Sequence, residues 1–94
     1  MLVRVKLDRM PRDLQIRVVE SMNDPSQLDK ASYSGQPGVR RAVCLNPYTR
    51  TRTIGRLAKT DPHKKIREIA YETLAGRQKV KEQRGKRRES WEKR

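Results

Sequence analysis

The sequence has few of the residues that build catalytic and metal sites. Its 94 residues include one cysteine, one histidine, three tyrosines, one tryptophan and no phenylalanine. A single cysteine excludes an internal disulfide, and one thiol with one imidazole is too little for a metal cluster. A hydrolase or transferase needs a nucleophile, or a paired acid and base, in a cleft. We therefore expect no metal, no cofactor and no enzymatic activity.

The isolated reactive residues have ordinary structural interpretations. His63 follows Pro62 in a basic stretch, which favours a solvated surface side chain over a general base. Cys44 lies among apolar residues and is expected to fill space in the core rather than act as a nucleophile. The five glycines match neither a phosphate-binding loop nor a dinucleotide fingerprint.

Long apolar segments are also missing. No run approaches the ~20 apolar residues that a membrane span needs. The charged N-terminus has no apolar region of the kind that signal peptides carry. Together with the single cysteine, these absences favour a cytoplasmic, reduced setting and no membrane partner.

Positive charge is what the sequence has in excess, with 24 Lys and Arg against 11 Asp and Glu. Residues 1–38 carry six basic and five acidic groups, whereas residues 39–67 carry nine basic groups and one acidic group. Residues 77–94 add nine basic groups against three acidic ones. Such clustering attracts polyanions, meaning nucleic acid, an anionic membrane or an acidic protein surface. The alternative is a solvated surface that serves solubility, and the uneven distribution favours a polyanion partner.

Prolines recur at positions where helices could begin, and they predict five short helices. Asp24 can cap a helix whose first turn holds Pro25, while Asn46 precedes a proline and should end a helix, which leaves Thr49 free to cap the next one. Each segment carries one narrow apolar stripe. The helices are expected at residues 11–22, 25–34, 37–45, 49–60 and 62–75, the last with a possible extension. Short amphipathic helices of this kind are not stable alone and must stack on neighbours.

A repeated pattern suggests how they stack. The dipeptide Val39-Arg40 is echoed by Ile66-Arg67 and by Ile16-Arg17, at intervals that differ by about one helical turn. The run "VRRAVCLNPYTRTRTIGRLAKTDPHKKIREIA" resembles the variant leucine-rich repeat, a HEAT-like helical repeat. The resemblance is clear for residues 38–75, weaker for 14–37, and absent from both ends. It implies an all-α fold of short helix pairs in a right-handed superhelix, here two repeats and a closing helix. Such repeats define an architecture and not an activity.

The resemblance does not extend to a cofactor. Some members of the family carry a cysteine-rich segment that binds an iron–sulfur cluster, and Cys44 alone cannot supply one. The chain accordingly divides into an N-terminal arm (1–9), a helical repeat domain (10–76) and a basic C-terminal extension (77–94). The alternation in "MLVRVKLD" fits a short arm, an edge strand that pairs with another chain, or a frayed end. Gly76 and Gly85 should interrupt any helix in the extension, which predicts a frayed helix or a disordered arm.

The best candidate binding surface is a basic stripe with helical spacing. Arg52, Arg56 and Lys59 stand at i, i+4 and i+7, opposite the apolar stripe of the same helix. Like charges at this spacing cost some stability, and a bound anion would remove that cost. The full set of expected nucleic-acid contacts is Arg40, Arg41, Arg52, Arg56, Lys59, Lys64, Lys65, Lys86, Arg87, Arg88 and Trp91.

Some members of this set have a second interpretation. In helical repeats an arginine after the leading Val or Ile can pair with an aspartate of a neighbouring turn, which here would join Asp61 to Arg40 or Arg67. Trp91 could stack on a base, or dock on the core or on a partner protein.

The sequence thus favours a small nucleic-acid-binding protein, or a subunit of a larger nucleoprotein complex, that acts through backbone electrostatics. DNA and RNA are not distinguished, since phosphate contacts carry no base information. The alternative function is a protein-interaction adaptor with an acidic partner.

Overall fold

The computed structural model describes the backbone of residues 9–92 and the side chains of residues 9–79, and this part of the chain is all-α. The helices are α1 (Arg12–Ser21), α2 (Pro25–Ala31), α3 (Pro37–Leu45), α4 (Thr51–Thr60) and α5 (Lys64–Glu92). The predicted all-α fold is confirmed for these residues. The strand-like alternation expected near the N-terminus falls on residues 1–8, which lie outside the described residues.

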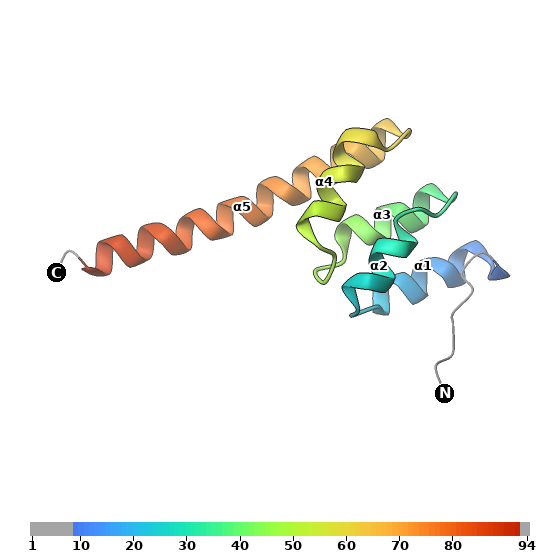
Figure 1. The fold of residues 1–94 in the computed structure, drawn as a ribbon, viewed down its shortest axis with the longest axis horizontal. Helices are drawn as coiled ribbons and strands as arrows, with labels where there is room; N and C mark the ends of the chain where they lie inside the picture. The colour runs from blue at the N-terminus through green and yellow to red at the C-terminus, as the bar shows by residue number, and fades with distance from the viewer. Residues whose placement is uncertain (1–8, 93–94) are drawn as a thin grey trace.

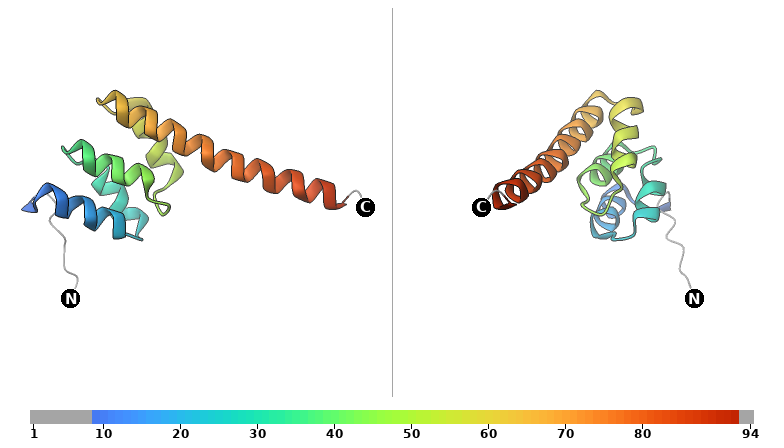
Figure 2. Two further views of the ribbon diagram at one scale, coloured as in Figure 1. Left: turned by 180° about the vertical axis from the view of Figure 1, so that it is seen from behind. Right: turned by 60° about the vertical axis from the view of Figure 1, so that its left-hand side comes forward.

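The helices form two layers (Figures 1 and 2). Helices α1, α3 and α5 follow one another in one layer, and α2 and α4 cover one side of it. Helix α3 lies at the centre and contacts all four other helices. Helix α5 packs on α3 and α4 and then continues away from the body toward the C-terminus.

The predicted ends of the first, third and fourth helices lie within two residues of the observed ones, and α2 ends at Ala31, three residues before its predicted end. The predicted interruption of the C-terminal extension by glycine is wrong. Helix α3 has the predicted bounds, and α2 begins where Asp24 accepts a hydrogen bond from the Ser26 amide at 2.9 Å. Helix α5 continues through Gly76 and Gly85 to Glu92, so neither glycine interrupts it. A glycine inside a helix costs roughly 1 kcal/mol relative to alanine, yet it keeps its backbone hydrogen bonds. No proline follows Pro62 to stop the helix.

The predicted cap of α4 is also wrong. Thr49 does not cap that helix, because its hydroxyl donates a hydrogen bond of 2.7 Å to the carbonyl oxygen of Val43 near the end of α3. The residue at the cap position of α4 is Arg50, whose side chain makes no capping hydrogen bond. The loop between α3 and α4 is therefore held by the helix that precedes it.

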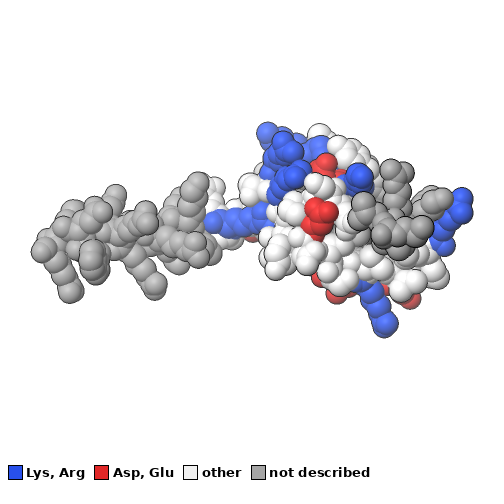
Figure 3. All heavy atoms as spheres, turned by 60° about the horizontal axis from the view of Figure 1, so that its bottom comes forward, with Lys and Arg blue, Asp and Glu red and all other residues white. Residues whose placement is uncertain are grey.

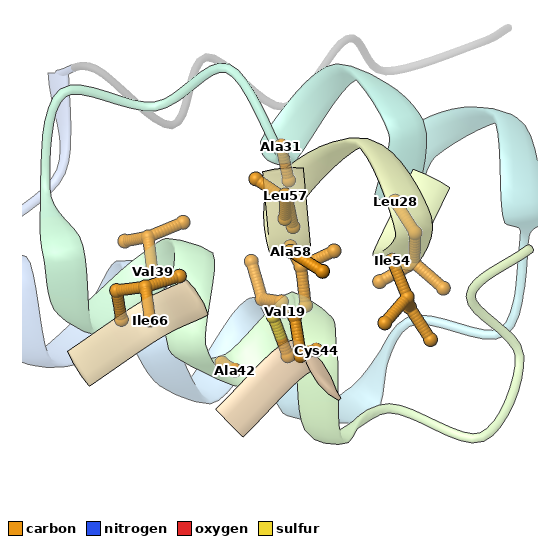
Figure 4. Packing of buried hydrophobic residues seen from close by; sticks show 12 residues of the cluster. Val19, Leu28, Ala31, Val39, Ala42, Cys44, Ile54, Leu57, Ala58 and Ile66 are labelled. Atoms are coloured by element: carbon orange, nitrogen blue, oxygen red, sulfur yellow. The ribbon is translucent and has the colours of Figure 1, made fainter. Parts of the chain in front are cut away.

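One hydrophobic core joins all five helices (Figure 4). Its buried side chains are Val19, Leu28, Ala31, Val39, Ala42, Val43, Cys44, Ile54, Leu57, Ala58, Ile66 and Ala70. Gly38 lets α1 and α3 approach closely, since a Cβ there would stand 3.0 Å from Cδ1 of Ile16. Cys44 is completely buried, as expected, and its burial, reinforced by the charge of Asp61, raises the pKa of its thiol to about 11.

Two polar side chains fasten the loop between α3 and α4. The Asn46 side-chain amide donates hydrogen bonds of 2.9 Å to the carbonyl oxygens of Val19 and Met22, which ties this loop to the end of α1. From the other direction, Nη1 of Arg77 donates to the carbonyl oxygen of Thr49 at 2.7 Å. Nη2 of Arg77 lies 3.4 Å from the carbonyl oxygen of Asn46. The contacts of the helical body therefore continue to Arg77, one residue past the boundary that the sequence suggested.

Arg77 should stabilise the fold although it belongs to the basic block near the C-terminus. We expect Arg77→Met to lower the free energy of unfolding by about 1 kcal/mol, because methionine keeps the apolar stem and loses every hydrogen bond to the loop. Lys79→Met, at an exposed position two residues later, is the matched control and should change it little. Urea unfolding followed by circular dichroism measures both. Equal stability of the two variants would show that the Arg77 contacts contribute nothing.

Candidate nucleic-acid interface

Arg40 belongs to the core and not to the surface. Its residue exposure is 8%. Nε and Nη2 of Arg40 donate to the two carboxylate oxygens of Asp61, at 2.7 and 3.3 Å. Nη1 donates to the carbonyl oxygen of Ser34 at 2.8 Å. Of the two pairings suggested for Asp61, the one with Arg40 is therefore present, and Arg40 is removed from the candidate interface.

Asp61 is more deeply buried than Arg40, with a residue exposure of 3%, and its carboxylate accepts hydrogen bonds from a side chain and from the backbone. Its Oδ1 accepts the amide of His63 at 2.8 Å, in addition to the guanidinium of Arg40. Burial by itself would raise the pKa of Asp61, but the hydrogen bonds from Arg40 and from the His63 amide, with the charge of Arg40, hold the pKa below its ordinary value. Asp61 therefore stays ionised while its charge is compensated internally.

Arg67 repeats part of the arrangement around Arg40. Nη1 of Arg67 donates to the carbonyl oxygen of Asp61 at 2.7 Å, six residues earlier in the chain. Arg40 makes the same bond to Ser34, also six residues earlier. Each arginine thus holds the loop that leads into its own helix. Arg67 bonds the backbone of Asp61 and not its carboxylate.

The basic stripe of α4 lies on the surface as expected, but its three members differ. Arg52 and Lys59 are exposed, on the side of the helix opposite the buried stripe that includes Leu57. Arg56 is only half exposed, because its Nη2 donates a hydrogen bond to Oγ of Ser32. Its guanidinium carbon lies 4.0 Å from the centroid of the Tyr33 ring. Among the described residues, Arg52 and Lys59 thus have no ion-pair partner, whereas Arg56 between them is bound to Ser32 and Tyr33.

Helix α2 supports this face of α4 through contacts with a regular spacing. Hydrogen bonds join Arg50 to Ser26, Thr53 to Asp29 and Arg56 to Ser32, each across 24 residues. Asp29 accepts the Thr53 hydroxyl at 2.9 Å and brings a negative charge to this side. In Figure 3 the largest group of Lys and Arg side chains lies at the upper left of the helical body with acidic side chains beside it, and other basic side chains stand apart at the right edge and at the bottom.

The other surface cations predicted from the sequence fall at two places. Lys64 and Lys65 are exposed in the first turn of α5, directly after the loop that follows α4, so they lie near the same end as Lys59. Arg41 is exposed in the other layer, where it lines a hollow between α1 and α3 together with Ile16 and Leu45. The structure therefore does not bring Arg41 together with the stripe of α4.

The remaining candidates lie on the distal part of α5. The backbone of Lys86, Arg87, Arg88 and Trp91 is helical and extends beyond the body (Figure 1), and their side chains lie outside the described residues. The part of the chain that is described contains no helix with the length and apolarity of a membrane span. Nor does it hold three or more His, Cys, Asp or Glu side chains in an arrangement suited to a metal ion.

Sequence reasoning missed Tyr33, which the structure places against the basic stripe. Tyr33 follows α2 and is 68% exposed although it is aromatic. Its contact with Arg56 depends on how α2 packs on α4, which no local pattern reveals. The sequence nevertheless contains a usable signal. The dipeptides Ile16-Arg17 and Val39-Arg40 are 23 residues apart, and Tyr33 and Arg56 are separated by the same interval.

Comparisons with protein-family models, curated protein sequences and solved structures found no match to this chain. The resemblance to the variant leucine-rich repeat, clearest over residues 38–75, stays a prediction.

The Arg40–Asp61 pair should make folding sensitive to acid. Because the pKa of Asp61 in the folded protein lies below the ordinary value of 3.8, the pair stabilises the fold above that value. This stability is lost as the pH falls through the lower, folded-state pKa. Asp61→Asn should lower the free energy of unfolding by about 3 kcal/mol at neutral pH, since Arg40 would keep a buried charge without its partner. The variant should also lose less of its remaining stability than the wild type on acidification.

Chemical denaturation from neutral pH to pH 2 measures both effects. If Asp61→Asn does not fold, the paired replacement Arg40→Met with Asp61→Leu removes both charges and should recover part of the stability. If Asp61→Asn has the stability of the wild type at neutral pH and loses as much of it on acidification, the Arg40–Asp61 pair does not stabilise the fold.

Proposed function

We propose that this protein binds nucleic acid without catalysis, alone or as a subunit of a nucleoprotein complex. The proposed contact surface consists of the exposed face of α4 and the first turn of α5. One observation carries the proposal. Asp61 is the only acid among residues 39–67, and it is buried against Arg40. The exposed cations of that segment, Arg52 and Lys59 among them, therefore have no acidic residue within the segment to neutralise them.

The contact would be made with phosphates. Arg52 and Lys59 form no ion pair within the described residues, and neither do Lys64 and Lys65. Exposed cations of this kind bind polyanions by releasing condensed counterions, and they carry little information about base sequence. The proposal also includes Lys86, Arg87 and Arg88 on the distal part of α5, which would contact further phosphates, and Trp91, which would stack on a base. A cytoplasmic, reduced setting, suggested by the single cysteine, belongs to this proposal.

We also infer that the architecture is a short helical-repeat stack. The pairs α1–α2 and α3–α4 would be two HEAT-like repeats, and α5 would be the closing helix. Three features support this: the two layers of helices, the equivalent bonds of Arg40 and Arg67 to the loops before them, and the bonds between α2 and α4 at a constant interval of 24 residues. Helical repeats present extended surfaces to partners.

The second candidate function is a protein-interaction adaptor. It is favoured by the hollow between α1 and α3, whose lining includes the apolar residues Ile16, Leu45 and Pro47 beside Arg12 and Arg41. Leu45 is 53% exposed there. An acidic protein with a short apolar segment would match this combination. The hollow lies in the layer that does not contain α4, so the two functions can be tested separately.

The salt dependence of binding tests the primary proposal. We expect the double variant Arg52→Gln with Lys59→Gln to bind nucleic acid more weakly, because two phosphate contacts are lost. Its plot of log affinity against log salt should be shallower than that of the wild type by about 1.8 on duplex DNA, or about 1.4 on a single strand. Fluorescence anisotropy with labelled nucleic acids of unrelated sequence measures the slope. Folding should be unaffected, because both side chains are exposed.

The matched control removes the same charge from the other layer. Arg17→Gln with Arg41→Gln also removes two exposed positive charges, here from α1 and α3. If the α4 face binds phosphates, the control should keep a slope close to that of the wild type. A control that loses as much slope as the α4 variant would mean that binding follows net charge alone. If only the control variant has a shallower salt slope, the phosphates contact the surface around the hollow between α1 and α3 and not the α4 face.

A further inference from the structure

Tyr33 is an exposed aromatic ring that the protein holds in place. It is 68% exposed, so the guanidinium of Arg56, 4.0 Å from the ring centroid, covers no more than one face. Arg56 is itself anchored, because it donates a hydrogen bond to Ser32. Ser32 in turn donates to the carbonyl oxygen of Asp29 in α2. The ring is thus fixed by a chain of contacts while most of its surface remains in water.

The surroundings of the ring combine free positive charge with open backbone. Arg52 and Lys59 are exposed on either side of Arg56 along α4, about 10 Å apart along the helix axis. Arg56 lies between them, and the Tyr33 ring stands against its guanidinium. Gly55, one position before Arg56, adds no side chain to this face, and a Cβ there would meet no atom within 4 Å.

We propose that this place is a binding site for single-stranded nucleic acid, in which a base stacks on the free face of Tyr33 and phosphates contact Arg52 and Lys59. The inference rests on the proposed nucleic-acid-binding function and specifies the form of the ligand. In a duplex, each base is already stacked and paired, so its faces are not available to a side chain. In a single strand, bases can stack on aromatic rings with little dependence on sequence.

The anchored ring suits this role better than a mobile one. Immobilising a free side chain on binding costs conformational entropy, and a ring already held by Arg56 avoids most of that cost. The guanidinium of Arg56 makes a cation–π contact with the ring face opposite the proposed base, so Arg56 positions Tyr33 and does not itself contact the base. This explains why the central residue of the stripe is engaged internally while its two neighbours are free.

Tyr33→Leu is the direct test, in the full-length chain with labelled oligonucleotides. Leucine removes the aromatic face and keeps an apolar side chain. We expect it to weaken binding to a thymidine oligonucleotide roughly fivefold to a hundredfold. Binding to an abasic oligonucleotide of equal length, which offers phosphates without bases, should be unchanged. The slope against log salt should also stay the same, because no cation is removed. Tyr33→Phe keeps the ring and should bind like the wild type.

Tyr71→Leu is the matched control, since Tyr71 is 57% exposed on α5 and lies outside the proposed site. It should leave binding of the thymidine oligonucleotide unchanged. Circular dichroism establishes that each variant is folded. Equal losses for Tyr33→Leu and Tyr71→Leu, equal losses on the normal and abasic oligonucleotides, or wild-type binding of a duplex as tightly as of the single strand would each overturn the inference.

The two proposals can fail separately. If the variant of Arg52 and Lys59 shows the shallower salt slope while Tyr33→Leu binds the thymidine oligonucleotide normally, the α4 face contacts phosphates and the stacking inference is wrong. If the wild type binds neither single strands nor duplexes, both proposals are wrong. If this face binds an acidic protein instead, the wild type would bind neither single strands nor duplexes but would retain that acidic protein.

Discussion

The buried ion pair between Arg40 and Asp61 is the interaction on which the rest of the structure depends. Arg40 is in the first turn of α3, the helix that contacts all the others, and Asp61 ends α4. The pair joins the loop before α3, through Ser34, to the loop before α5. Burying two charges costs desolvation energy that only good geometry offsets. Here both oxygens of the carboxylate accept hydrogen bonds, and the pair connects α3 with the end of α4.

The same pair also affects the charge of the protein surface. Asp61 would otherwise be the one acid able to neutralise the cations of its segment, and its burial leaves them without that partner. Helix α4 then has two distinct sides. Ile54 and Leu57 anchor it in the core, and Arg52 and Lys59 face water on the other side. The buried side chains of α4 fix the position of the helix, and its exposed side chains carry the positive charge. A bound anion therefore does not have to order the helix.

The sequence revealed most of what depends on local rules. The bounds of α3 followed from a proline at its start and an Asn-Pro at its end. The Arg40–Asp61 pair was one of two anticipated pairings, because in helical repeats an arginine after the leading Val or Ile can pair with an aspartate of a neighbouring turn. The apolar stripe of α4 placed Arg52 and Lys59 on its outer side, as the structure confirms. The bounds of α3 and the outward face of α4 use residues within a few turns of one another, whereas the ion pair joins residues 21 positions apart.

The features that the sequence did not reveal depend on packing between distant segments. The stacking of Arg56 on Tyr33 requires α2 to lie against α4 in one register. Arg77 appeared to belong to a separate basic extension, but its hydrogen bonds to the loop between α3 and α4 bring it into the body. Gly76 and Gly85 were expected to interrupt the extension of the last helix, but α5 passes through both, because a glycine lowers helix stability only modestly and keeps its backbone hydrogen bonds.

Mapping the contact surface residue by residue tests the central claim, that the α4 face beside Tyr33 binds single-stranded nucleic acid. The measurement is a titration of the isotope-labelled protein with a short thymidine oligonucleotide, followed by amide chemical shifts in nuclear magnetic resonance spectra. The account requires the largest changes at Tyr33, Gly55 and Arg56, with Arg41 and Leu45 unaffected. Changes confined to the hollow between α1 and α3, with none on α4, would contradict it.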